Sequence, residues 1–245
     1  MNATIVPDAT GFAGAHGGYL MSLALEAMAG AVGDPQRRPR SLTMHLLAPV
    51  APGPVELEPR VERAGGTMTS VSLRLLQEGA TVGTALGAFG RARPSLERSD
   101  ASMPAVPPPE QLAPLAAPPV PQATLHVEHR PAAGPLPLSG GDRAELVVWV
   151  RLADDRPVDP PAATFLADAA APALYAVLTD YVAMPSADVT LHFAPGPPPD
   201  DPWVLLAVRS RFAAEGYALE DGELWARDGR LLLRSGQLRR VLAPR

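Results

Sequence analysis

One short motif occurs twice in this chain, and the two copies lie far apart. It reads LTMHLLA at 42–48 and VTLHFAP at 189–195. Each copy carries a threonine and, two residues later, a histidine: Thr43 and His45 in the first, Thr190 and His192 in the second. The separation is far longer than the roughly 20–50 residues of a solenoid repeat. The repeat therefore predicts a duplicated domain, and differences between the copies mark where a single active site could lie.

Each copy of the motif follows a segment of helical character, at 17–28 and at 164–178. Asp-Gly pairs at 221–222 and 228–229 predict hairpin turns. Alternation of apolar and polar residues predicts antiparallel strands at 55–64, 68–77, 81–91, 123–130, 144–152, 203–212 and 231–242. A helix followed by several strands buries its apolar face by lying across a curved sheet. The expected fold is therefore α+β, with two antiparallel sheets that each wrap a central helix.

A proline-rich segment, 94–123, separates the two copies. Proline cannot donate a ladder hydrogen bond or continue a helix, so we expect an extended strap across the surface. The predicted organisation is an N-terminal domain over 1–93, the strap over 94–123 and a C-terminal domain over 124–245. Two further stretches rich in proline, 131–142 and 194–202, are predicted loops.

Composition excludes several classes of protein. The chain has no cysteine, which excludes a disulfide framework, a thiol nucleophile and cysteine-ligated zinc. The net charge is −5 and the arginines are dispersed, whereas a nucleic-acid-binding protein presents a basic stripe to the phosphates. No nucleophile elbow, phosphate-binding loop, dinucleotide fingerprint or zinc-binding H-E-x-x-H is present, so we expect neither a metal nor an organic cofactor.

The N-terminal residues, MNATIVPDATGFAGAHGG, lack a basic region followed by an apolar run, so no secretory signal is expected. No apolar stretch approaches the roughly 18–20 residues that a membrane helix needs. The sequence therefore predicts a soluble cytoplasmic protein that has neither a membrane nor a nucleic acid as its partner.

Six segments carry a resemblance to a known family: HGGYLMSLALEAM (16–28), the stretch from SLTMHLLAP to GTALGAFG (41–90), VVWVRL (147–152), FLADAAAP (165–172), SADVTLHF (186–193) and SGQLRRV (235–241). In this order they resemble the acyl-CoA thioesterase II and thioesterase-like family, which has a double hotdog fold. The resemblance covers most of the chain outside the proline-rich segment. It implies a tandem hotdog, an acyl-CoA or acyl-carrier thioester as the substrate, and assembly into homo-oligomers.

The same resemblance assigns a candidate catalytic set. The Asp–Thr–Gln set of the family falls on Asp168, Ser186 and Gln237. Ser186 departs from the pattern, because it keeps the hydroxyl but lacks the methyl group. The first copy has Met21 and Gly87 at the positions that correspond to Asp168 and Gln237. We therefore expect the active site in the second copy.

Thioester hydrolysis needs an attacking water, a group that accepts its proton and donors for the oxyanion. Asp168 is the candidate base, and partial burial is expected to raise its pKa. Gln237 and Ser186 would orient the water. The backbone N–H groups of Gly17 and Gly18, at the start of the first helix, are the candidate oxyanion donors.

Each of these residues also has a purely structural interpretation. Asp168 could cap or complement a helix terminus, and Gln237 could be a solvated strand residue. Ser186 could shape a turn after a proline. Gly17 and Gly18 could serve close packing of helix against sheet.

The remaining candidates bind substrate or suggest other reactions. In double hotdog dehydratases a histidine from one half faces an aspartate from the other, and His16 with Asp168 would mimic this dyad. HGGYLMSLALEA lacks the proline of the dehydratase pattern. A dehydratase or cyclase of polyketide or fatty-acid metabolism, and a protein that binds an acyl group without turnover, are the alternatives to a hydrolase. Further expectations are an acyl tunnel lined by Ala167 and Ala170, CoA phosphates met by Arg37, Arg38 and Arg40, and a structural role for His45 and His192.

Overall fold

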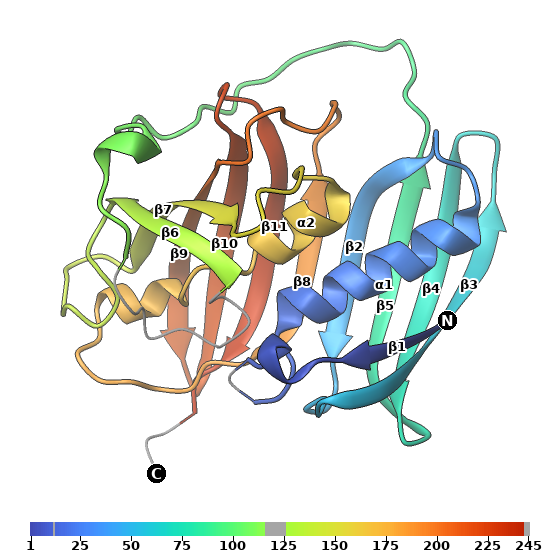
Figure 1. Cartoon of the computed structure of the whole chain (residues 1–245), viewed down its shortest axis with the longest axis horizontal. Helices are drawn as coiled ribbons and strands as arrows, with labels where there is room; N and C mark the ends of the chain where they lie inside the picture. The colour runs from blue at the N-terminus through green and yellow to red at the C-terminus, as the bar shows by residue number, and fades with distance from the viewer. Residues whose placement is uncertain (12, 116–125, 243–245) are drawn as a thin grey trace.

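A single sheet of 11 strands curves around two helices (Figure 1). The computed structural model describes residues 1–11, 13–115 and 126–242. The strand order is β1-β3-β4-β5-β2-β8-β11-β10-β9-β7-β6, and neighbouring strands run antiparallel. The α+β class is confirmed, and the two predicted sheets are the halves of one continuous sheet, which is consistent with a tandem hotdog. Hydrogen bonds between β2 and β8 merge both halves into one sheet, as two hotdog units joined edge to edge would form.

The first half of the sheet contains β1 (Asn2–Ile5), β2 (Arg38–Leu46), β3 (Gly53–Ala64), β4 (Met68–Gln77) and β5 (Ala80–Gly90). The second half contains β6 (Val127–Ala133), β7 (Glu145–Leu152), β8 (Ser186–Phe193), β9 (Val204–Ala214), β10 (Tyr217–Ala226) and β11 (Leu231–Arg240). The helices are α1 (Gly17–Val32) and α2 (Pro160–Leu166), with 3-10 turns η1 (Pro7–Ala9), η2 (Pro109–Gln111) and η4 (Ala173–Ala176).

The repeated motif lies on the two central strands, where its copies pair with each other. Thr43 on β2 lies opposite Thr190 on β8, and their Oγ1 atoms are 3.1 Å apart although 147 residues separate them in the chain. Equivalent residues that face each other in an antiparallel pair define a local two-fold axis between the halves. The register extends the equivalence outward, because Gly87 pairs with Leu42 as Gln237 pairs with Val189.

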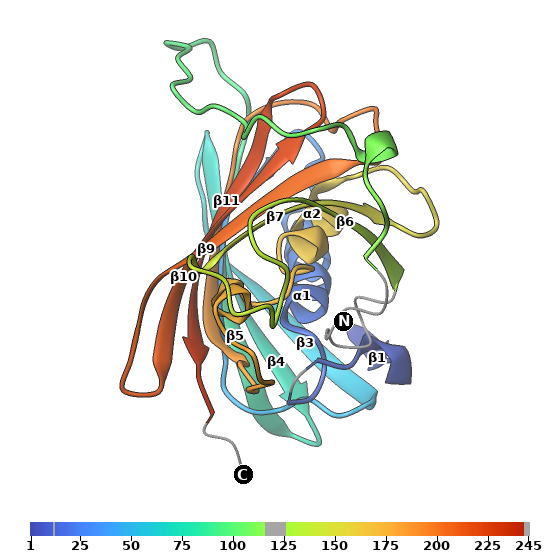
Figure 2. The ribbon, with the colours of Figure 1, turned by 90° about the vertical axis from the view of Figure 1, so that its left-hand side faces the viewer.

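Helix α1 crosses the concave face of the first half, and both helices lie on this side of the sheet (Figure 2). Its apolar residues recur at helical spacing, and those turned to the sheet are buried: Leu20, Met21, Ala24, Leu25, Ala27 and Met28. The helix ends at Gly33, whose φ of 64° is left-handed and whose N–H donates to the Ala29 carbonyl. Among the described residues, no helix is long and apolar enough to cross a membrane.

The second helix is shorter than predicted and lies earlier in the chain. The prediction was 164–178, whereas α2 begins at Pro160 and ends at Leu166. Asp159 caps its start by accepting a hydrogen bond from the Ala162 N–H at 2.9 Å, and proline favours the first helical positions. Pro172 prevents continuation beyond the following turn, because it lacks an N–H and would clash with the preceding carbonyl. Asp168 consequently lies in the turn after α2.

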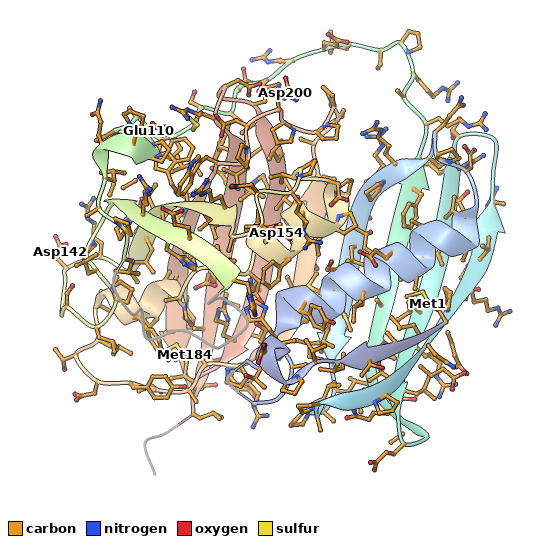
Figure 3. All side chains as sticks on the ribbon, viewed as in Figure 1. Met1, Glu110, Asp142, Asp154, Met184 and Asp200 are labelled. Carbon is orange, nitrogen blue, oxygen red and sulfur yellow. The ribbon has the colours of Figure 1, made fainter. Side chains whose placement is uncertain are left out.

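The described part of the proline-rich segment lies on the outer face of the second half. Its apolar residues pack against a cluster of strand residues; Met103, Val106 and Leu112 meet Val147, Trp149, Trp203, Leu205 and Trp225. The Trp149 Nε1–H donates to the Pro107 carbonyl at 2.9 Å. Glu110, labelled in Figure 3, pairs with Arg227 at 2.6 Å. The predicted strap is thus seen as far as residue 115, and 116–123 lie outside the described residues.

Two local predictions in the second half need correction. The β9–β10 hairpin turns at Glu215 and Gly216, which have φ of 53° and 79°. The pair at 221–222 lies within β10 instead, whereas the pair at 228–229 forms the predicted turn. The strand predicted at 123–130 is displaced to β6, and 123–125 lie outside the described residues.

Candidate active site

A cavity of about 140 Å³ opens at the end of the central seam where β8 begins and β11 ends. The N-terminus of α1 and the loop after β2 form its wall from the first half, and the turn after α2 closes it from the second. Its polar lining consists chiefly of His16, Asp168, Ser186, Arg239 and Arg240. Met184, labelled in Figure 3, lies at this end of the sheet, and its carbonyl accepts a hydrogen bond from Arg239 Nη1 at 3.4 Å.

Asp168 is buried and receives hydrogen bonds from both halves of the molecule. Its Oδ2 accepts from the Gly18 N–H at 2.9 Å, across 150 residues of chain. Its Oδ1 accepts from Gln237 Nε2 at 3.1 Å and from Arg239 Nη2 at 3.2 Å. The side chain is therefore oriented by three donors.

Ser186 and Gln237 form a hydrogen-bonded chain that ends on Asp168. Ser186 Oγ donates to Gln237 Oε1 at 2.9 Å, and Gln237 passes a hydrogen bond on to Asp168. Both side chains come from adjacent strands, β8 and β11, whose pairing sets their distance. The structure thus brings all three residues of the predicted set into contact.

The glycines at the start of α1 allow the carboxylate of Asp168 to approach the backbone. A Cβ at Gly18 would lie 2.9 Å from Asp168 Cβ, and one at Gly17 would lie 3.1 Å from Asp168 Oδ2. The Gly18 N–H is directed at Asp168, so it is already occupied. Gly17 lines the cavity, and this position suits an oxyanion donor.

His16 immediately precedes α1 and is buried against the same carboxylate. Its Nε2 lies 3.6 Å from Asp168 Oδ2, and its ring packs edge-on against Phe165 with centroids 5.6 Å apart. Its Nδ1 is buried without a partner among the residues that the structure describes. Burial and the charge of Arg239 lower the pKa of His16, and nearby Asp168 offsets only part of this effect, so the imidazole is neutral at pH 7.

Two charged residues behind Asp168 were missed in the sequence. Arg239 is 5% exposed and Glu220 is 4% exposed, and Arg239 Nε donates to Glu220 Oε1 at 2.7 Å. Glu220 Oε2 in turn accepts the Ala173 N–H at 2.6 Å. The sequence did contain a sign of this burial. Inward and outward residues alternate along β11, so Arg239 lies on the same inward face as Gln237. A buried arginine needs a charged partner.

The expected rise in the pKa of Asp168 is not found. Burial does favour the neutral acid, but the charges of His16 and Arg239 and the hydrogen bonds from Gln237 and Gly18 outweigh it. Of these two charges, that of Arg239 is permanent, whereas His16 carries one only when it is protonated. Asp168 is therefore a carboxylate at neutral pH.

The other candidate residues have different positions. Arg37 is held by Asp34, Thr69 and the Gly65 carbonyl, and Arg38 and Arg40 lie at the far end of β2. Ala170 lines the cavity, whereas Ala167 is buried in the core. His45 and His192 are exposed on the central strands. Within the described part of the chain, no group of three or more metal-ligating side chains occurs.

Comparison with known families identifies this arrangement. The acyl-CoA thioesterase C-terminal domain matches residues 101–241, and the N-terminal domain of the same family matches residues 6–90. The chain belongs to the acyl-CoA thioesterase family. A search of curated proteins gave no match.

Solved structures share the fold along the whole chain. A conserved protein of unknown function with a hotdog fold from Alicyclobacillus acidocaldarius is 27% identical, with a TM-score of 0.90 over 100% of this chain and 93% of that one. A proposed thioesterase II from Thermobifida fusca is 25% identical, with a TM-score of 0.84 over 99% and 92%. An acyl-CoA thioesterase II from Mycobacterium marinum, at 23% identity and a TM-score of 0.79 over 99% and 93%, supports the fold alone.

Gly18→Ala tests the close approach of α1 to Asp168. The added methyl would lie 3.0 Å from the Phe165 carbonyl oxygen as well as against Asp168, so we expect a loss of about 1–3 kcal/mol in the free energy of unfolding. Urea denaturation measures this loss. Gly30→Ala in the same helix is the control, because nothing lies within 4 Å of its new methyl and alanine favours helix by up to about 1 kcal/mol. Equal effects of the two variants would contradict the contact.

Proposed function

We propose that this chain hydrolyses the thioester bond of an acyl-CoA in the Asp168 cavity. The observation that carries the proposal is the chain of hydrogen bonds from Ser186 through Gln237 to the buried Asp168 carboxylate, which lines the cavity beside a helix N-terminus. Family membership supplies the reaction class, and the geometry supports a role for each of these residues.

Asp168 would hold and deprotonate the attacking water through Oδ2. Oδ1 already accepts two hydrogen bonds, from Gln237 and Arg239, whereas Oδ2 accepts only the Gly18 N–H. A water that donates to Oδ2 can direct its oxygen at a thioester carbonyl in the cavity. Ser186, held by Gln237, is the second group that orients it.

The reaction proceeds through a tetrahedral intermediate. The water oxygen bonds to the carbonyl carbon as its proton moves to Asp168, and the carbonyl oxygen becomes an oxyanion. The Gly17 N–H at the start of α1 would donate to that oxyanion, where the helix dipole favours negative charge. Collapse breaks the carbon–sulfur bond, and the CoA thiolate takes up the proton. The products are the carboxylic acid and CoA.

The lining of the cavity indicates how the substrate would be held. Leu20, Leu46 and Val50 form an apolar wall against which an acyl group would pack. Arg240 is exposed and lines the same cavity, so it is the arginine placed to meet CoA phosphates. In this cavity Arg240 takes the role that was expected of Arg38 and Arg40, which lie at the far end of β2.

The contact between His16 and Asp168 supports a second candidate reaction, dehydration of a 3-hydroxyacyl thioester. The two side chains come from different halves and lie 3.6 Å apart. Asp168 is a carboxylate and cannot donate a proton to the departing hydroxyl. Neutral His16 is better suited to accept a proton than to donate one, so neither side chain supplies the acid that dehydration needs. Hydrolysis therefore remains our first proposal.

Asp168→Asn tests the hydrolase directly. The amide cannot accept a proton, so we expect kcat to fall by at least about 100-fold with a panel of acyl-CoAs and a thiol-detecting reagent. Asp188→Asn on the same strand as Ser186 is the control and should leave kcat unchanged. Thermal melts followed by circular dichroism establish that both variants fold. A folded Asp168→Asn protein with wild-type kcat would exclude Asp168, and an enoyl product from a 3-hydroxyacyl-CoA would favour the dehydratase.

The double variant Glu220→Gln with Arg239→Gln tests how the charge of Asp168 is held. It removes the buried pair together, so the cationic partner of Asp168 is lost and the pKa of Asp168 should rise. Activity requires the carboxylate, so the acidic limb of the kcat/KM profile should move to higher pH.

The matched control is Glu223→Gln with Arg234→Gln, a pair 3.5 Å apart on the same two strands, in which Arg234 is exposed and Glu223 is half-buried. It should leave the profile in place, because solvent screens its charges from the cavity. An acidic limb that moves equally in both double variants, or in neither, would contradict the role assigned to Arg239.

A further inference from the structure

A second hollow, of about 60 Å³, lies at the opposite end of the central seam. The start of β2, the N-terminus of α2 and the loop after β8 form its walls. The Asp168 cavity is built from the start of β8, the N-terminus of α1 and the loop after β2. The two hollows therefore use the same elements with the halves exchanged.

Along β2, β8 and the loops that follow them, the correspondence holds at the separation of 147 that relates Thr43 to Thr190. Several residues that line the second hollow are images of residues that line the first: Arg38, Pro39 and Arg40 for Pro185, Ser186 and Ala187, Phe193 for Leu46, and Pro197 for Val50. The residues that cap the two helices, His16 and Asp159, also line the two hollows. The second hollow is thus the two-fold mate of the candidate active site.

The mate lacks the hydroxyl, amide and guanidinium groups that surround Asp168 in the site. Pro39 stands in place of Ser186, and Gly87 and Phe89 stand where Gln237 and Arg239 stand in the site. A Cβ at Gly87 would lie 2.9 Å from Met28 Sδ, so a glutamine has no room there. This hollow cannot activate water in the same way.

The mate has instead a rim of arginine over an apolar floor. Arg38 is exposed and, within the described residues, neither Arg38 nor Arg40 forms an ion pair; Arg40 Nη2 donates to the Gly90 carbonyl at 3.1 Å. Asp159 lies in the wall, but its Oδ1 accepts the helix-capping N–H. The floor is apolar, with Val158, Phe193 and Leu232, and Arg230 Nη1 holds the proline-rich wall through the Pro197 carbonyl at 3.1 Å.

We propose that this second hollow binds the phosphate-bearing arm of coenzyme A without hydrolysing its thioester. Guanidinium groups match phosphate oxygens in charge and geometry, and the apolar floor suits the methyl-bearing part of the pantetheine arm. The inference rests on the proposed function only in that an acyl-CoA hydrolase meets this ligand. Each chain then binds two CoA groups and hydrolyses one.

Isothermal titration calorimetry with CoA and with a thioether analogue of an acyl-CoA tests this proposal on the full chain. The wild-type protein should bind two equivalents. Arg38→Gln with Arg40→Gln should weaken one of the two sites by about tenfold or more, because two charge-assisted contacts are lost, and should leave kcat for hydrolysis unchanged.

Two further variants separate the hollow from general charge effects. Arg63→Gln with Arg93→Gln removes the same charge from exposed positions elsewhere and should leave two equivalents. Ala194→Trp fills the hollow without a change in charge and should remove the second equivalent.

The outcomes for the two proposals are distinct. One equivalent bound by the wild type, or two equivalents that persist in both Arg38→Gln/Arg40→Gln and Ala194→Trp, would overturn the second site whether or not hydrolysis occurs. Two equivalents, one of them lost in those variants, in a protein that hydrolyses no acyl-CoA would support the second site and contradict the hydrolase.

Discussion

The pairing of β2 with β8 is the contact on which the rest of the structure depends. Its register places Thr43 opposite Thr190 and thereby fixes the two halves about a local two-fold axis. Because of that axis, the N-terminus of α1 meets the turn after α2, and the Gly18 N–H reaches a carboxylate 150 residues away. A shift of one residue would turn the side chains of these strands to the opposite face. Neither half alone contains the site, since His16, Gly17 and Gly18 come from one and Asp168, Ser186 and Gln237 from the other.

Buried charge is the second constraint. Asp168, Arg239 and Glu220 form a connected row in which each charge meets an opposite one, and the Ala173 N–H closes its end. An unpaired charge at this depth would be strongly destabilising, so the removal of one of these side chains alone destabilises the fold by leaving another without its partner. It also has a chemical consequence. Arg239 occupies Oδ1 of Asp168 and keeps the group ionised, which leaves Oδ2 for a water molecule.

Local pattern predicted much of the fold, and the failures have physical causes. The strands at 68–77 and 144–152 were correct to within a residue, since alternation is a local property. The register of β2 against β8, which joins the halves, was not predicted, because no local pattern encodes it. Asp159 caps the start of α2 and Pro172 prevents a helix from continuing to 178; both signals were present in the sequence but were outweighed by the alanine-rich run.

The candidate site was predicted through resemblance to a family, which pointed to Asp168, Ser186 and Gln237. Arg239 and Glu220 were missed because a polar residue in a strand is usually solvated, and their burial follows from contacts with Asp168 and Ala173, 71 and 47 residues away in the chain. A crystal structure with a thioether analogue of an acyl-CoA tests the central claim most directly. We predict a water on Asp168 Oδ2 at about 3–3.5 Å from the carbon that replaces the thioester carbonyl. An analogue whose reacting carbon lies outside the Asp168 cavity would contradict the account.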